Sequence, residues 1–120
     1  MVKPVVTKLA EVFLRNQWRL STAESCTGGL VATALTTLAG SSDWFERGYV
    51  TYSNEAKTQD IGVNSSLIQQ HGAVSEEVAQ AMAQGAKKSS SSHIALSITC
   101  LLYTSPSPRD TERSRMPSSA

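Results

Sequence analysis

Apolar and polar positions along the chain follow two different periods. Residues 5–16 carry apolar side chains at helical spacing with charged residues between them, which predicts an amphipathic helix. Residues 75–90 have the same period, with a serine that can cap the first turn, acids near the start and two lysines near the end. Short apolar runs predict strands at three places, residues 18–23, 48–53 and 93–99.

Three further segments lie between the predicted strands. One lies between the first and second strands, and two lie between the second and third. Residues 30–40 form an apolar stretch that predicts a helix ending at Gly40. Residues 54–61 predict a turn or a short helix, and residues 64–72 a capped helix that ends at Gly72. The order helix, strand, helix, strand, helix, helix, strand favours a layered α/β domain.

Composition narrows the classes of protein that fit this pattern. A chain of 120 residues with 40% hydrophobic residues is enough for one domain with one core. The net charge of +1 gives no support for binding to nucleic acid or to an anionic membrane, and no apolar run is long enough to span a bilayer. Two cysteines do not make a disulfide framework, so we expect reduced thiols and a cytoplasmic location. No residue cluster has metal-ligand spacing, and we expect neither a metal nor a cofactor.

The periodic pattern stops at Cys100. The segment after it is rich in proline and serine, and residues 100–110 read as the translation of a common sequencing-library adapter. Residues 114–120 read as the translation of the standard continuation of that adapter. We therefore expect residues 100–120 to be a non-native or disordered tail without packed secondary structure. Residues 1–99 would then be the N-terminal part of the domain, with the strand at 93–99 left as an exposed edge.

Candidate chemistry lies first in the octapeptide TAESCTGG, residues 22–29. Gly28 and Gly29 allow a sharp turn and a close approach to a ligand, and the helix start behind them offers N–H groups to an oxyanion or a phosphate. Ser25 lies at the rim of this turn and can act as a nucleophile if a base removes its proton. The alternative is an ordinary capped helix start, with Ser25 or Thr27 as the cap.

A second candidate stretch is YVTYSNEAK, residues 49–57. Tyr52 ends the predicted strand, and Lys57 follows five residues later. A lysine that is shielded from water has a lowered pKa and can serve as a base. The alternative is a core tyrosine followed by a surface lysine.

Four other residues have weaker claims to a role. Cys26 is a rival nucleophile, because a helix start lowers the pKa of a thiol, but its position next to Ser25 favours a small packed residue. Glu24 can either orient Lys57 or form a surface ion pair. His71 lies at a predicted helix end, where the helix dipole favours it, and His93 has no partner that the sequence indicates.

The motifs TAESCTGG, GSSDWFERGYVTYSNEAK, IGV and HGAVSEEVAQAMAQGA occur in this order between residues 22 and 86. Together they resemble the C-terminal domain of the CinA family, the competence- and damage-inducible proteins whose stand-alone relatives are nicotinamide-nucleotide amidases. The resemblance covers almost all of residues 5–99 and implies a layered α/β/α sandwich, here incomplete at its C-terminus. The family's glycine-rich loop, TG-x-AGP, is expected after the last strand, whereas this chain reads SITC.

The resemblance also implies a function and a site. Ser25, Tyr52 and Lys57 would be the catalytic group, with Thr27, Gly28, Gly29 and Thr99 lining the substrate pocket at one end of the sheet. The reaction would convert nicotinamide mononucleotide to nicotinate mononucleotide and ammonia, with Lys57 and Tyr52 taking and relaying the serine proton. The intact protein would be a homodimer acting on a small-molecule nucleotide, and this chain would have little activity. The alternative function is a non-catalytic nucleotide-binding or regulatory module.

Overall fold

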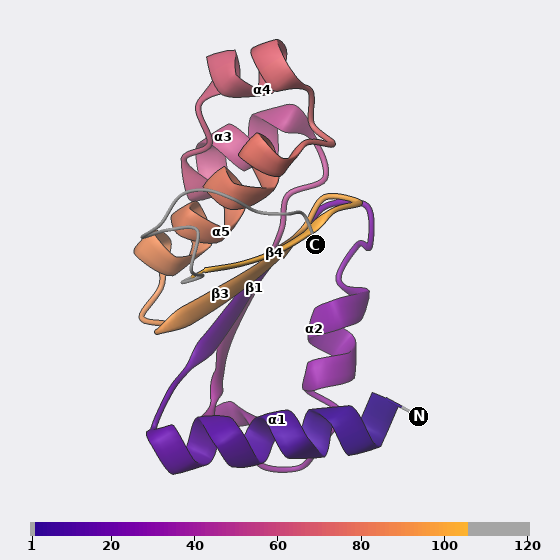
Figure 1. The fold of residues 1–120 in the computed structure, drawn as a ribbon, viewed down its shortest axis with the longest axis vertical. Coiled ribbons are helices and arrows are strands. Elements are labelled where there is room, and N and C mark those ends of the chain that lie inside the picture. The colour runs from indigo at the N-terminus through magenta and orange to yellow at the C-terminus, as the bar shows by residue number, and fades with distance from the viewer. Residues whose placement is uncertain (1, 106–120) are drawn as a thin grey trace.

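The computed structural model describes residues 2–105 and shows a layered arrangement of helices around one sheet (Figure 1). In chain order the elements are α1 (Val2–Asn16), β1 (Leu20–Glu24), α2 (Leu30–Leu35), the short 3-10 turn η1 (Ser41–Asp43), β2 (Phe45–Val50), α3 (Asn54–Ile61), α4 (Ser65–His71), α5 (Glu76–Ser89), β3 (Ile94–Ile98) and β4 (Leu102–Ser105). This order agrees with the predicted one, shows that residues 54–61 form a helix, and adds η1 and the final strand β4.

The four strands form a single mixed sheet in the order β2-β1-β3-β4. β1 lies in the centre and pairs in parallel with β2 on one side and with β3 on the other. β4 pairs antiparallel with the outer edge of β3. The carboxyl ends of β1, β2 and β3 therefore lie at the same edge of the sheet, where open α/β sheets usually carry their sites.

Helices cover both faces of the sheet, as the α/β/α prediction requires. Figure 1 shows α3, α4 and α5 on one side and α1 and α2 on the other. The alternation of strand side chains explains this: Ala23 and Ala95 pack with α5, whereas Leu20 packs with α1 and Trp44 on the opposite face. The layered α/β class is thus confirmed.

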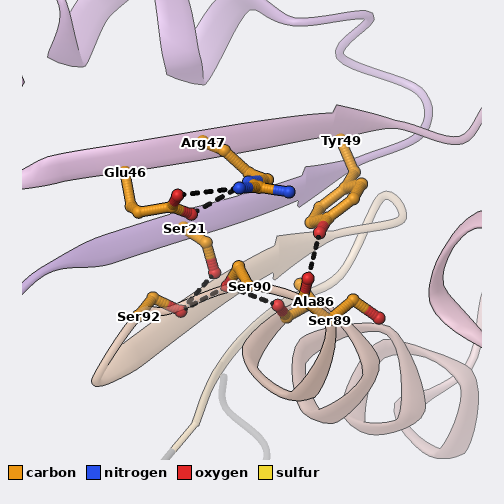
Figure 2. Close-up of polar contacts among 8 residues, drawn as sticks. All are labelled: Ser21, Glu46, Arg47, Tyr49, Ala86, Ser89, Ser90 and Ser92. Atoms are coloured by element: carbon orange, nitrogen blue, oxygen red, sulfur yellow. Dashed lines mark hydrogen bonds and ion pairs between the residues drawn. The ribbon is translucent and has the colours of Figure 1, made fainter.

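Hydroxyl groups tie α5 to the sheet at the amino edge of the strands (Figure 2). The Ser92 hydroxyl lies 2.8 Å from the hydroxyls of both Ser21 and Ser90, and Ser90 donates to the Ala86 carbonyl at 2.7 Å. On β2, the Tyr49 hydroxyl donates to the Ser89 carbonyl at 3.1 Å. These contacts fix the last turn of α5 against the edge of the sheet opposite to the predicted site.

Two predicted elements have clearly different bounds in the structure, and most of the others differ by one to three residues at one or both ends. The helix predicted for residues 30–40 ends at Leu35, because Thr36 and Thr37 turn their hydroxyls back onto carbonyls of the preceding turn. The strand predicted for residues 48–53 runs instead from Phe45 to Val50. Its pairing with β1 begins at Leu20, and the chain leaves the sheet before Ser53, whose side chain caps α3.

The expectation that no packed structure follows Cys100 is wrong for residues 102–105. Leu102, Tyr103 and Thr104 belong to β4, and alternation along the strand buries Tyr103 in the cluster under α5 while Leu102 stays exposed. The run of apolar, aromatic and β-branched residues suits a strand, so β3 is not an exposed edge. Residues 106–120 lie outside the described residues, and the adapter origin of the tail stays a prediction.

Candidate active site

Ser25 lies directly after β1 and faces the layer that contains α3 and α5. Ala23, two residues earlier, packs under α5, and the period of two along a strand places Ser25 on the same face. The Ser25 N–H donates to the Ile98 carbonyl of β3 at 2.9 Å, which continues the sheet by one residue. Ser25 is buried, with 7% of the residue exposed.

Lys57 comes to this hydroxyl from the first turns of α3. Its side chain points into the protein and is fully buried, because α3 starts at the Ser53 cap immediately beside the end of β2. The amine Nζ lies 3.1 Å from the Ser25 hydroxyl, 3.0 Å from the Thr51 carbonyl and 3.1 Å from the Tyr52 carbonyl. The predicted meeting of Ser25 and Lys57 at one end of the sheet is confirmed as geometry.

Burial lowers the pKa of Lys57 below its ordinary value of 10.5, because the charged ammonium is poorly solvated there. Within residues 2–105 no carboxylate forms an ion pair with Lys57 to offset this cost. In the neutral amine, two N–H bonds can point to the carbonyls of Thr51 and Tyr52, and the lone pair then faces the Ser25 hydroxyl. In that neutral state the amine can accept a proton from the serine hydroxyl.

Glu24 has a role that neither predicted alternative describes. Its carboxylate is fully buried on the opposite face of β1 and binds the turn and the start of α2. It accepts hydrogen bonds from the Thr27 hydroxyl at 2.6 Å and from the N–H groups of Gly29, Val31 and Ala32 at 3.1, 3.0 and 2.7 Å. Glu24 therefore neither contacts Lys57 nor forms a surface ion pair; it holds the loop that follows the nucleophile.

This finding corrects the expectation that the glycine turn offers free N–H groups to the substrate. The Gly28 N–H donates to the Ser25 carbonyl at 3.1 Å, and the Gly29 N–H is taken by Glu24. Both glycines have positive φ, 63° and 105°, so they are needed for the turn itself. In the described part of the chain, the N–H groups of Cys26 and Thr27 have no hydrogen-bond partner and stay available next to Ser25.

Tyr52 reaches the site through its main chain, and Thr99 lies next to Ser25 at the edge of the sheet. Tyr52 gives its carbonyl to Lys57, whereas its side chain is 73% exposed and makes no hydrogen bond within residues 2–105. The buried Thr99 follows β3 beside Ser25, but its hydroxyl donates to the Ala73 carbonyl at 2.8 Å. Lys57 contacts Ser25 directly, and the relay through the Tyr52 hydroxyl stays a prediction.

The cysteines correct two further expectations. Cys26 is exposed rather than packed, and it is joined to Cys100 by a disulfide, so the two thiols are not reduced. The Cα atoms of the pair are 5.9 Å apart. Cys26 and Cys100 are neighbours in space because each follows a residue at the sheet edge, Ser25 or Thr99, and these two lie side by side.

The histidines lie outside this group. His71 is in the last turn of α4, with Nδ1 3.7 Å from the Glu77 carboxylate, a contact that counts as an ion pair only when the imidazole is protonated. His93, for which the sequence indicated no partner, accepts a hydrogen bond from the Arg19 N–H at 2.9 Å. Both are explained by local structure.

Thr51 is the residue of this region that sequence reasoning missed. Parallel pairing of Glu24 with Val50 places Thr51 next to Ser25, and the buried Thr51 hydroxyl has no hydrogen-bond partner in the described chain. Its carbonyl is one of the two that orient Lys57. The signal was present in the strand pattern, since the residue that precedes Tyr52 must face the same layer as Ser25.

These contacts define an α/β protein with a buried serine–lysine pair at the carboxyl edge of a parallel three-strand core. Among residues 2–105, no group of three or more His, Cys, Asp or Glu side chains is placed to hold a metal ion. No helix in the same range has the length and hydropathy needed to cross a membrane.

Comparison with known proteins identifies the family to which the chain belongs. Residues 2–108 match the CinA C-terminal domain, and the chain belongs to that family. The nicotinamide-nucleotide amidohydrolase PncC of Escherichia coli K12 is 60% identical over 80 residues, which are 67% of this chain and 48% of that protein. The protein of the same name from Pseudomonas putida is 47% identical over 98 residues, 82% of this chain and 61% of that protein.

Solved structures agree with the fold. The CinA superfamily protein ECK1530/EC0983 of Escherichia coli superposes with a TM-score of 0.79 and 32% identity, over 81% of this chain and 56% of that one. The competence/damage inducible protein CihA of Agrobacterium tumefaciens superposes with a TM-score of 0.78 and 42% identity, over 80% and 58% of the two chains. The chain spans about half the length of the PncC relatives and about a fifth of the length of longer CinA-like relatives, such as the one from Syntrophobacter fumaroxidans.

Proposed function

We propose that this chain carries the nucleophile and the base of an amidohydrolase that acts on the carboxamide of nicotinamide mononucleotide. The observation that supports this most strongly is the 3.1 Å contact between the fully buried Lys57 amine and the Ser25 hydroxyl. The names of the relatives from Escherichia coli and Pseudomonas putida supply the substrate. Their reaction class is acyl transfer, which a serine activated by a neutral amine is suited to perform.

In the first half of the proposed reaction, Ser25 attacks the carboxamide carbon while Lys57 takes the hydroxyl proton. The tetrahedral intermediate then collapses, the carbon–nitrogen bond breaks, and the Lys57 ammonium returns this proton to the leaving nitrogen as ammonia departs. The positive charge on the pyridinium ring withdraws electrons and makes the carbonyl more reactive. A nicotinoyl ester of the mononucleotide is left on Ser25.

In the second half, neutral Lys57 removes a proton from a water molecule that attacks the ester carbon. The new intermediate releases nicotinate mononucleotide, and Ser25 recovers its proton from the Lys57 ammonium. Throughout this cycle the carbonyls of Thr51 and Tyr52 would hold Nζ in place, so that its remaining position faces Ser25 and the reacting groups bound there. In this proposal Tyr52 contributes its main-chain carbonyl, which accepts a hydrogen bond from Lys57.

The oxyanion of both intermediates would be bound by the N–H groups of Cys26 and Thr27. The N–H of the residue after a nucleophilic serine has this role in other hydrolases that place the serine between a strand and a helix. Each such donor contributes about 3 kcal/mol of transition-state stabilisation. Glu24 contributes indirectly, because it fixes the loop that presents these two N–H groups.

We infer that turnover by the 120-residue chain is slow. The chain departs after Thr99 from the glycine-rich loop that the family resemblance implies, and an acyl group misplaced by about 1 Å costs on the order of 100-fold in rate. The dimer and the cytoplasmic location stay predictions, and the disulfide removes the argument from reduced thiols for the latter.

The test is incubation with nicotinamide mononucleotide, with ammonia, nicotinate mononucleotide and the mass of the chain all measured. We expect slow product release or a single acyl adduct on Ser25, both lost in Ser25→Ala and both kept in Cys26→Ser and Tyr52→Phe. Product formed equally well by Ser25→Ala would remove the serine from its role. Tight binding of the mononucleotide with neither product nor adduct would favour the non-catalytic binding module instead.

A further inference from the structure

Three hydroxyl residues form a row across the carboxyl edge of the sheet. The register of β1 with β2 and β3 places Thr51 on one side of Ser25 and Thr99 on the other. The N–H groups of Thr51 and Ser25 extend the two ladders by one residue, with hydrogen bonds of 2.8 and 2.9 Å to the neighbouring strands. Paired residues of adjacent strands face the same side, so the row faces the layer that contains α3 and α5. All three residues are buried.

The three hydroxyls of this row differ in their partners. The Ser25 hydroxyl meets the Lys57 amine at 3.1 Å, and the Thr99 hydroxyl donates to the Ala73 carbonyl at 2.8 Å. The Thr51 hydroxyl is buried without a hydrogen-bond partner among the described residues. A buried polar group of this kind is costly, and beside a reactive pair it is explained by a contact that forms during the reaction.

The second half of the proposed reaction requires such a contact. Once Ser25 carries the acyl group, its oxygen has no proton to offer, and the lone pair of Lys57 is left for the attacking water. That water has a second hydrogen, which needs an acceptor of its own. The carbonyls of Thr51 and Tyr52 already accept from Lys57, whereas the Thr51 hydroxyl next to Ser25 is free to accept.

We propose that the Thr51 hydroxyl binds the hydrolytic water, accepting one hydrogen while the Lys57 amine takes the other as a proton. This role rests on the proposed function, because it belongs to the second half of that reaction. The water oxygen forms the new bond to the ester carbon, and collapse of the intermediate breaks the bond to the Ser25 oxygen, which recovers the proton from Lys57. Thr51 itself neither gains nor loses a proton. Its hydroxyl is therefore needed for release of the acid and not for the attack by Ser25.

The experiment separates the two halves with p-nitrophenyl acetate, an activated ester. The initial burst of p-nitrophenol measures acetylation of Ser25, and mass spectrometry of the washed chain follows the loss of the acetyl group, with Ser25→Ala as blank. We expect Thr51→Val to slow this loss about tenfold and to change the burst rate by less than about twofold, because valine keeps the shape and the carbonyl but removes the hydroxyl. Thr51→Ser keeps a hydroxyl and should restore the faster loss.

Thr22→Val is the matched control. The Thr22 hydroxyl is also buried without a partner in the described part of the chain, but the alternation of β1 places it on the face opposite to Ser25. The same substitution there should leave both rates unchanged. Neither valine variant removes a side-chain hydrogen bond of the described chain, so both should fold, as denaturant titration can verify.

The water site is overturned if Thr51→Val loses its acetyl group at the unmodified rate, or if acetylation and its loss slow equally. An equal effect in Thr22→Val, or no recovery in Thr51→Ser, also overturns it. Failure of the proposed function looks different. A chain that shows the Thr51 effect but yields neither product nor adduct from nicotinamide mononucleotide keeps the water site and loses the substrate, whereas a chain whose Ser25 is never acetylated loses both.

Discussion

At the scale of single residues, Lys57 is the most informative group in the molecule. It is fully buried, its pKa is lowered by desolvation, and it has main-chain carbonyls and one hydroxyl as partners instead of a carboxylate. A purely structural lysine at this place would be costly, because the protein must either bury a charge or give up a proton. The cost is understandable if the neutral amine is needed for proton transfer.

Lys57 should make the stability of the chain depend on pH in a defined window. Because its pKa in the folded protein lies below 10.5, the unfolded chain binds more protons between these two values, and the free energy of unfolding rises with pH there. We expect Lys57→Met to lose this rise, as measured by urea unfolding at several alkaline pH values. Lys87→Met, in the last turn of α5, serves as control and should keep the slope; an unchanged slope in Lys57→Met would contradict the lowered pKa.

Two buried hydroxyls of the sheet form a matched pair for a test of hydrogen-bond satisfaction. The Thr22 hydroxyl is buried without a partner in the described chain, whereas the Ser97 hydroxyl donates to the Ala79 carbonyl at 2.6 Å. We expect Thr22→Val to raise the free energy of unfolding by about 1 kcal/mol and Ser97→Ala to lower it by about 1 kcal/mol. Denaturant titration of both variants checks this, and a loss of stability in Thr22→Val would show that the hydroxyl has a partner in solution.

At the scale of elements, α5 owes its position to a close approach at Gly85. A Cβ atom added there would collide with the Ile61 carbonyl oxygen at the end of α3. Gly85→Ala should therefore push α5 away from α3 and lower the free energy of unfolding by about 3 kcal/mol, despite the better helix propensity of alanine. Gln84→Ala, on the exposed side of the same turn, should change stability by less than about 0.5 kcal/mol. Thermal unfolding of the two variants distinguishes these effects. If helix propensity decided the outcome, Gly85→Ala would be more stable than the unmodified chain.

The helices and strands also differ in how well the sequence predicts them. α5 and β3 were predictable because their periods, caps and terminal charges all agree. The early end of α2 depends on threonine hydroxyls that bind nearby carbonyls, and the role of Glu24 depends on N–H groups five to eight residues away that only the folded loop brings together. β4 was missed because the proline- and serine-rich composition of the whole tail hid a short stretch with strand character.

At the scale of the whole molecule, the sheet lies between two layers of helices. The end of β1 places a loop-binding carboxylate on one face and the candidate nucleophile on the other. Glu24 fastens the loop on the α2 side, and Ser25 meets Lys57 on the α3 side. The pairing of Ser25 with Lys57 was accessible from the sequence through strand ends and family motifs. The exact donors around it were not, because hydrogen bonds within the turn decide which N–H groups stay free.

The sheet is completed by β4, and its contribution can be measured. Tyr103 is buried in the cluster under α5 and links the last strand to the rest of the fold. Tyr103→Ala should lower the free energy of unfolding by about 3 kcal/mol, whereas Leu102→Ala, at a position that is 53% exposed, should have little effect. Equal effects in the two variants, measured by denaturant titration, would show that β4 does not pack on the core.

The most direct test of the central claim is covalent labelling of the chain with a fluorophosphonate, which reacts with activated serines whether or not turnover is complete. Mass spectrometry of the intact chain and of its peptides should find one adduct, on Ser25, at a rate that rises with pH as Lys57 loses its proton. The adduct should disappear in Lys57→Met and persist in Lys87→Met. Labelling that is absent from Ser25, or that is equally fast in Lys57→Met, would contradict a serine activated by the buried lysine.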